Sequence, residues 1–299
     1  LMNAQLAGAD TFNAATAVYV GNDANVGTNK AIRLTSVTIN DGNSGNNYFV
    51  NYTNSVGNIT QAQLTVAAAN DAKFVSETDN PNYFGALYNG FVNGETSADL
   101  GGALHITRTN LNVNDARTYT GVLQPSGLTS DNYQITFVQG NYTIVPAKNL
   151  LVRAVATSTY GSAPTYQYTA QYLAANGTTI SYIGDLASNP HSSQSAINLT
   201  ATASNVGVAA VTINDGGTSA NIGYAPVSPR LSQSGNVAAG QYNLDKVPFA
   251  PAANFEGLTV VGQLVVNPMT ITSPTLGANS ITKVYDGNAV ISANAINAS

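Results

Sequence analysis

The sequence predicts an all-β protein built from tandem immunoglobulin-like β-sandwich domains, with the two ends of the chain forming a split domain. Three observations lead to this prediction: short runs in which apolar and polar residues alternate, Gly- and Asn-rich turns between the runs, and one sequence pattern that recurs at the end of successive groups of strands. No segment of ten or more residues keeps a helical period. The 299 residues suffice for two or three domains, and the 43% of hydrophobic residues suffice for packed cores.

The alternating pattern is clearest between residues 132 and 145. Apolar residues alternate with polar ones from Tyr133 to Phe137 and again from Tyr142 to Ile144, and Gly140-Asn141 lies between the two runs. This arrangement predicts a hairpin that turns at Gly140-Asn141 and buries one face. The hexapeptide Val-Thr-Ile-Asn-Asp-Gly, at 37–42 and again at 211–216, predicts a strand that runs into a turn.

A repeated closure sets the domain boundaries. Each closure has an Asn followed by an aromatic residue, a strand, a glycine and a second strand; the three begin at Asn47-Tyr48, Asn132-Tyr133 and Asn254-Phe255 and contain Gly57, Gly140 and Gly262. A fresh apolar strand follows each closure: Leu64-Thr65-Val66, Leu150-Leu151-Val152 and Met269-Thr270-Ile271. Because prolines such as Pro146 and Pro268 stiffen the joints, we expect pieces at 1–63, 64–147, 148–268 and 269–299, strung in a row.

The two end pieces complement each other. Residues 269–299 start a sandwich, and residues 1–63 finish one. Two arrangements are open: the chain is one period of a longer tandem array, or separate subunits complete each other head to tail and form a filament. In the second arrangement the strand at 281–291 pairs with an edge in 1–63, and we expect the assembly residues to be Val284, Tyr285, Asp286, Gly287, Val290 and Ile291.

Several motifs resemble modules of large secreted bacterial adhesins. Lys283-Val284-Tyr285-Asp286-Gly287-Asn288 resembles the opening of a YDG domain, and residues 25–60 resemble its later part. Residues 64–147 resemble an MBG ("mostly bacterial immunoglobulin-like") domain through Gly90–Glu95, Asn132–Phe137, Gly140 and Val145-Pro146-Ala147. Residues 148–268 resemble a longer relative of the same domain. The resemblance implies a stalk or adhesive role in a filamentous-haemagglutinin-like protein and supplies no catalytic residues.

The low charge excludes several classes of protein and of site. Asp, Glu, Lys and Arg make up 8% of the chain, against about 25% in an ordinary globular protein. The ten basic residues are scattered, so no basic stripe is available for nucleic acid, and no apolar run approaches the ~18 residues of a membrane span. Cysteine is absent, which excludes disulfides and Cys-based metal sites.

Few residues are candidates for chemistry. The two histidines, His105 and His191, lie in no catalytic motif, so we expect no enzyme activity, no catalytic residues and no bound cofactor. Asp41 and Asn43 are weak calcium candidates, because Asp41–Asn46 offers closely spaced oxygen ligands, although the same residues suit a plain turn. The tyrosines Tyr160, Tyr166, Tyr168 and Tyr172 suit either a core or an exposed adhesive patch.

These observations predict a structural repeat of a bacterial extracellular filament or adhesin stalk. Its partners would be copies of itself, joined head to tail by strand complementation or as a tandem array. The alternative is a ligand-binding adhesin module that recognises a glycan or a host surface protein through 148–268. A third reading is an accessory module of an enzyme whose catalytic domain lies elsewhere in the gene.

Overall fold

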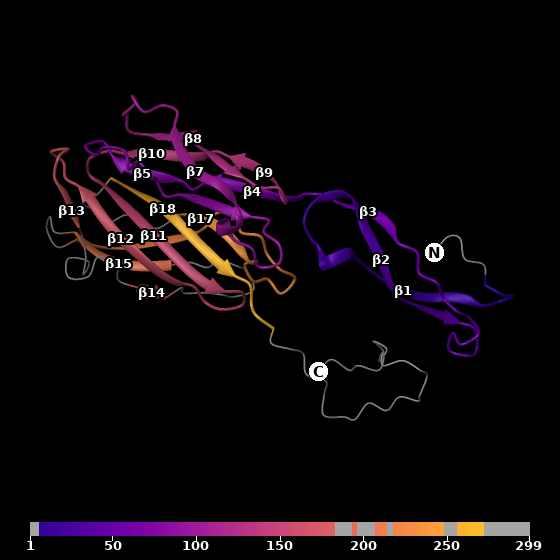
Figure 1. Ribbon diagram of the computed structural model, residues 1–299. Coiled ribbons are helices and arrows are strands. Elements are labelled where there is room, and N and C mark those ends of the chain that lie inside the picture. The colour runs from indigo at the N-terminus through magenta and orange to yellow at the C-terminus, as the bar shows by residue number, and fades with distance from the viewer. Residues whose placement is uncertain (1–5, 183–192, 196–206, 214–217, 248–255, 272–299) are drawn as a thin grey trace. The chain divides into compact units, whose positions relative to one another are not determined.

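The computed structural model describes residues 6–182, 193–195, 207–213, 218–247 and 256–271 (Figure 1). Strands arranged in several sheets make up nearly all of its regular structure, with two short 3-10 helices, η1 (Val20–Asn22) and η2 (Ser97–Asp99). The chain divides into a first unit, Leu1–Gln61 together with Thr270–Ser299, of which the structure describes 6–61 and 270–271, and a second unit, Ala62–Met269. The prediction of an all-β, sandwich-type fold is confirmed.

The first unit is a single antiparallel sheet in the described part of the chain. Its strands are β1 (Thr11–Tyr19), β2 (Gly27–Asn40) and β3 (Ser55–Ile59), in the order β1-β2-β3. The predicted turn follows β2, and Gly42 has the positive φ of 73° that a turn glycine adopts easily. Among residues 6–61, Ile39 is the single buried residue, at 8% exposure. This sheet therefore has an apolar face without a covering layer in the described residues.

The second unit begins with seven strands that form two sheets, which we call the first module. The sheets have the orders β6-β4-β9 and β5-β10-β8-β7. The strands are β4 (Ala62–Ala68), β5 (Asp71–Phe74), β6 (Ala86–Asn89), β7 (Gly101–Arg108), β8 (Thr118–Thr129), β9 (Tyr133–Val138) and β10 (Gly140–Val145). Alternate apolar side chains of both sheets are buried, among them Leu64, Val66, Tyr142 and Ile144.

The predicted hairpin at Gly140-Asn141 is wrong. β9 pairs in parallel with β4, whereas β10 pairs in parallel with β5 in the other sheet, so the chain changes sheets here without turning back. A Cβ on Gly140 would lie 2.5 Å from the carbonyl oxygen of Ala68. The glycine is therefore required for a close approach of two strands, and the sequence pattern of a Gly-Asn turn conceals this role.

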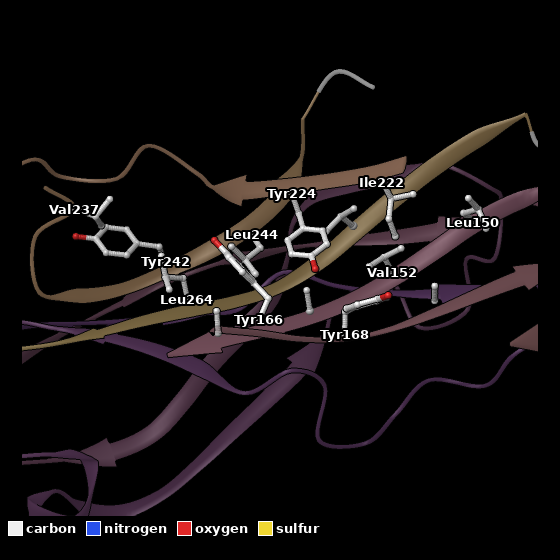
Figure 2. Packing of buried hydrophobic residues seen from close by; sticks show 14 of the residues in the cluster. Leu150, Val152, Tyr166, Tyr168, Ile222, Tyr224, Val237, Tyr242, Leu244 and Leu264 are labelled. Atoms are coloured by element: carbon white, nitrogen blue, oxygen red, sulfur yellow. The ribbon is translucent and has the colours of Figure 1, made fainter. Parts of the chain in front are cut away.

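The remaining strands form a second module from one sheet that curls over a core. Its order is β13-β12-β11-β18-β17-β16-β15, with β14 also paired to β12. The strands are β11 (Asn149–Thr159), β12 (Thr165–Leu173), β13 (Ile180–Tyr182), β14 (Ser193–Ser195), β15 (Gly207–Ile213), β16 (Thr218–Pro226), β17 (Gly240–Lys246) and β18 (Gly257–Asn267). The rings of Tyr166 on β12 and Tyr224 on β16 are 5.0 Å apart, although three strands separate β12 from β16 in the sheet (Figure 2). The sheet must fold back on itself to bring them together.

The two modules share two features of immunoglobulin-like sandwiches. In each, the first strand runs parallel to the last: β4 and β5 pair with β9 and β10, and β11 pairs with β18 over its whole length. In each, a tyrosine hydroxyl donates to the backbone four residues upstream, from Tyr119 to Asp115 O (3.0 Å) and from Tyr242 to Ala238 O (2.9 Å). Such a tyrosine corner fixes the loop before a sandwich strand.

Candidate functional site

The predicted assembly residues Val284, Tyr285, Asp286, Gly287, Val290 and Ile291 lie outside the described residues, as does His191. Within 1–63, where we expect the partner edge, the structure describes 6–63, which include the sheet β1-β2-β3. His105 is exposed on β7, where it pairs across the sheet with Ser126.

The calcium candidates lie in the turn after β2. Asp41 Oδ1 accepts hydrogen bonds from the backbone N–H groups of Asn43 and Gly45, both at 2.8 Å, and Asp41 Oδ2 accepts one from Asn47 at 3.2 Å. These bonds, that from Gly45 first, lower the pKa of the Asp41 carboxyl. Across the described ranges, no three His, Asp or Glu side chains are grouped so that they could hold a metal ion. The carboxylate thus acts here as an acceptor that shapes a turn.

The tyrosine cluster belongs to the core of the second module. The cluster that contains Leu150, Val152 and Leu264 includes Tyr166, Tyr168 and Tyr172, which are 0%, 5% and 8% exposed. Figure 2 labels Tyr166 and Tyr168 in this core. Tyr160 is partly buried at the edge of this core, and its hydroxyl lies 2.9 Å from Ser234 Oγ. The core interpretation is confirmed for the three buried tyrosines, which cannot contribute to an adhesive surface.

The principal buried contact between the modules is an apolar seam. We define the seam as Ala72, Phe74 and Val145 of the first module with Leu151, Leu173 and Val261 of the second, all at most 3% exposed. Residues that face away from each module's own core meet here, because successive side chains of a strand point to opposite faces. Fully buried side chains of this size each stabilise by about 1.5–3 kcal/mol, so the seam fixes the two modules to each other.

Polar side chains of the second module bind the backbone of the first. Arg153 Nη2 donates to Ala72 O (2.8 Å), and Gln263 Nε2 donates to Phe84 O (3.0 Å). In the opposite sense, Asn243 Oδ1 accepts from Asn70 N (2.9 Å) and Gln241 Oε1 accepts from Tyr88 N (3.0 Å). Asn70 lies in the break between β4 and β5, so these bonds satisfy backbone groups that no neighbouring strand reaches.

The modules lie side by side and run in opposite directions. These bonds and the strand registers place 66, 70 and 72 of the first module beside 157, 155 and 153 of the second. Residue numbers therefore rise along one module in the direction in which they fall along the other. The start of β4 and the end of β18 consequently lie at the same end of the second unit (Figure 1). The expected row of modules is therefore wrong for this pair, because the sequence does not show that the three-residue joint 146–148 between β10 and β11 reverses the chain.

A comparison with known families identifies part of the pair. Residues 64–143 match the family model of the MBG domain (YGX type). MBG domains are typical of bacterial surface proteins, so the match indicates a surface or adhesin-like, non-enzymatic module over this segment. No curated protein and no solved structure matches the chain significantly. In the described residues, no helix is long and apolar enough to cross a membrane.

A charged pocket lies beside the seam, lined by residues of the first module and by Arg153 of the second. Its volume is about 560 Å³. Asp79 pairs there with Lys73 (2.9 Å) and with the buried Arg108 (3.1 Å), and it accepts a hydrogen bond from Tyr83 Oη (3.2 Å). The other end of Arg108 donates from Nη2 to the carbonyl oxygens of Asn110, Leu111 and Val113. These pairs tie the loop that follows β5 to the sandwich.

Asp71 is the carboxyl of this pocket that lacks a close cation. It is 5% exposed, and Asp71 Oδ1 accepts a bond from Ala72 N (2.7 Å). Burial raises the pKa of Asp71 to about 6, and Arg153 offsets this only in part. An acid of this kind can exchange a proton near neutral pH, and its ionised form destabilises the fold.

Sequence reasoning missed the residues that join the modules. Arg153, Gln241, Asn243 and Gln263 occupy polar positions of alternating strands, where the pattern predicts exposure to solvent. One signal was available: Arg153 is the single charged residue within the otherwise uncharged β11 strand.

Proposed function

We propose that the chain is a structural repeat of a bacterial extracellular filament or adhesin stalk, in which successive repeats are joined head to tail. The MBG match supports the surface role, and the apolar seam is the observation that carries the structural role. The seam buries apolar side chains of the two modules against each other, whereas a ligand-binding array has no need of so much buried contact between neighbours.

The proposed mechanism is backbone pairing. Along β11 and β18, eleven residue pairs form one continuous parallel ladder, so a load applied along these strands is shared by many hydrogen bonds. The low content of charge, 8% of residues, leaves a neutral, Asn- and Thr-rich surface on which further strands can add without charge repulsion. In this proposal 269–299 of one copy completes the sandwich of 1–63 in the next, with Val284, Tyr285, Asp286, Gly287, Val290 and Ile291 at the junction.

Two arrangements satisfy this proposal, and one experiment separates them. The native protein is imaged by electron microscopy and its chain mass is measured. Ordered filaments of a 30.8 kDa chain support strand donation between subunits, whereas a much larger chain supports a tandem array. Monodisperse particles with saturable binding to a glycan or a host protein would instead favour the ligand-binding alternative through 148–268.

A deletion tests the proposed junction directly. Removal of 281–291 should abolish polymerisation under strand donation. The matched control replaces the turn 174–179 between β12 and β13 by a Gly-Ser segment of equal length, which leaves the proposed junction intact. Intact filaments after the deletion would rule out donation by this segment.

A further inference from the structure

We propose that the charged pocket beside the seam binds a neutral sugar, one of whose hydroxyl groups donates a hydrogen bond to the carboxyl of Asp71. This site is separate from the alternative ligand site through 148–268, because its lining comes from the first module apart from Arg153. The inference adds a binding role to the structural repeat and does not depend on head-to-tail assembly.

The pocket has the size of a small-molecule site and is formed before any ligand arrives. Its volume of about 560 Å³ lies within the roughly 300–1,000 Å³ of typical ligand pockets. Its walls are β5, the loop after β5, Tyr142 on β10 and Arg153 on β11. Because Lys73 and Arg108 both pair with Asp79, the loop is already tied to the sandwich, and binding has little ordering cost.

Asp71 supplies an acceptor that the protein leaves unused. This residue lines the pocket and is 5% exposed. Its Oδ1 accepts a hydrogen bond from Ala72 N (2.7 Å), and no described residue donates to its Oδ2. A buried carboxyl with an unpaired oxygen costs folding free energy, so a partner from outside the chain would remove a penalty. A ligand hydroxyl at Oδ2 would be such a partner.

The other charged side chains of the pocket already have protein partners. Lys73 Nζ lies 2.9 Å from Asp79 Oδ1. Arg153 Nη1 donates to Gln171 Oε1 (2.6 Å), and Arg153 Nη2 lies 3.9 Å from Glu77 Oε2. A ligand therefore meets one open acceptor and not a group of free charges.

The balance of charge favours a neutral ligand. Three cations and three carboxyls belong to the site: Lys73, Arg108 and Arg153 with Asp71, Glu77 and Asp79. An anion would have to displace carboxylates from their paired cations, and an amine would place an uncompensated positive charge beside Lys73 and Arg153. Both changes cost free energy in a partly buried site, whereas a hydroxyl group adds no charge.

Aromatic rings supply the apolar part of a sugar site. Tyr83 and Phe84 are half-buried and line the pocket beside Tyr142. The rings of Tyr83 and Tyr142 pack edge to face, with centroids 5.7 Å apart. A pyranose has an apolar C–H face that can pack on a ring and a rim of hydroxyl groups that donate and accept hydrogen bonds. A neutral sugar can therefore use the rings and the open carboxyl oxygen together.

Saturation-transfer NMR on the full-length chain at neutral pH tests the choice of ligand. The neutral probes are N-acetylglucosamine and the methyl glycosides of glucose, galactose and mannose; the charged probes of similar size are glucosamine and glucuronate. This measurement reads the signals of the sugar, so it works whether the chain is free or assembled. We expect at least one neutral probe to bind with a dissociation constant on the order of 1 mM, and both charged probes to bind at least about fivefold more weakly.

A pair of variants tests the location. Asp71→Asn should weaken binding of the neutral sugar by about tenfold, because hydrogen bonds to a charged acceptor are the stronger kind. Loss of the buried carboxylate should stabilise the fold at neutral pH, so weaker binding cannot be ascribed to unfolding. The matched control is Asp115→Asn, at an exposed position of the same module outside the pocket, which should leave binding unchanged. Three results would each overturn the proposal: no saturation of any neutral probe, tighter binding of glucosamine or glucuronate, or equal affinities of Asp71→Asn and the unmodified chain.

Discussion

The first unit and the second unit use the same strand chemistry and differ in what covers it. On β2, Ile32, Leu34 and Val37 occupy inward positions but remain half-exposed, and Ile39 alone is buried in residues 6–61. In the second unit, equivalent positions such as Leu150 and Tyr166 are fully buried beneath a second layer. Alternation of apolar residues therefore specifies a face, whereas stability requires a second face packed on it.

The largest difference should appear when one apolar side chain is truncated in each unit. Phe74→Ala removes a fully buried ring from the seam and should destabilise the second unit by about 3–5 kcal/mol, because a cavity adds to the lost burial. Val56→Ala, at a residue 60% exposed on β3, should change the free energy of unfolding by less than about 0.5 kcal/mol. Urea unfolding monitored by tyrosine fluorescence measures both.

Assembly sharpens this comparison. If β3 accepts a strand from a second copy, Val56→Ala should become more destabilising as the protein concentration rises, whereas the effect of Phe74→Ala should stay constant. Equal effects of the two truncations in dilute protein would contradict the view that the first unit has an uncovered face.

The sequence predicted the all-β class and many of the strands, because these depend on local alternation, and it offered a core as one of two interpretations of the tyrosines. It failed where one local pattern fits two long-range arrangements. Gly140-Asn141 suits a hairpin and also suits a change of sheet, and only the pairing of β9 and β10 with different partners decides between them. Likewise, Arg153 and Gln263 are polar residues on strands, and nothing local shows that a second module covers them.

Glycines of the closures provide the second test of the two units. A Cβ at Gly262 would overlap the backbone oxygen of Ala154, which cannot move without breaking the β11–β18 ladder. Gly262→Ala should therefore cost about 2–3 kcal/mol. At Gly57 the nearest atom is Ile32 Cδ1 at 2.6 Å, the free end of a half-exposed side chain that can rotate away. Gly57→Ala should cost less than about 1 kcal/mol by the same denaturation measurement. Equal losses would show that the first unit is packed as tightly as the second.

The smallest effect contrasts two carboxyl groups whose pKa values shift in opposite directions. Burial raises the pKa of Asp71 to about 6 from an ordinary value of 3.8, so the folded state loses stability as the pH rises from about 4 through about 6. Asp71→Asn removes that loss and should stabilise the protein at pH 7 by roughly 2 kcal/mol, with little effect near pH 4.

Hydrogen bonds lower the pKa of Asp41, so the contribution of this carboxylate to stability is present at neutral pH. That contribution is lost as the pH falls below the ordinary pKa range of an aspartate. Asp41→Asn should consequently destabilise at pH 7 and converge with the unmodified protein in acid. Melting temperatures measured from pH 3.5 to pH 8 decide the matter, and the same sign at neutral pH for both variants would refute the assignment of Asp71 to a buried, unpaired site.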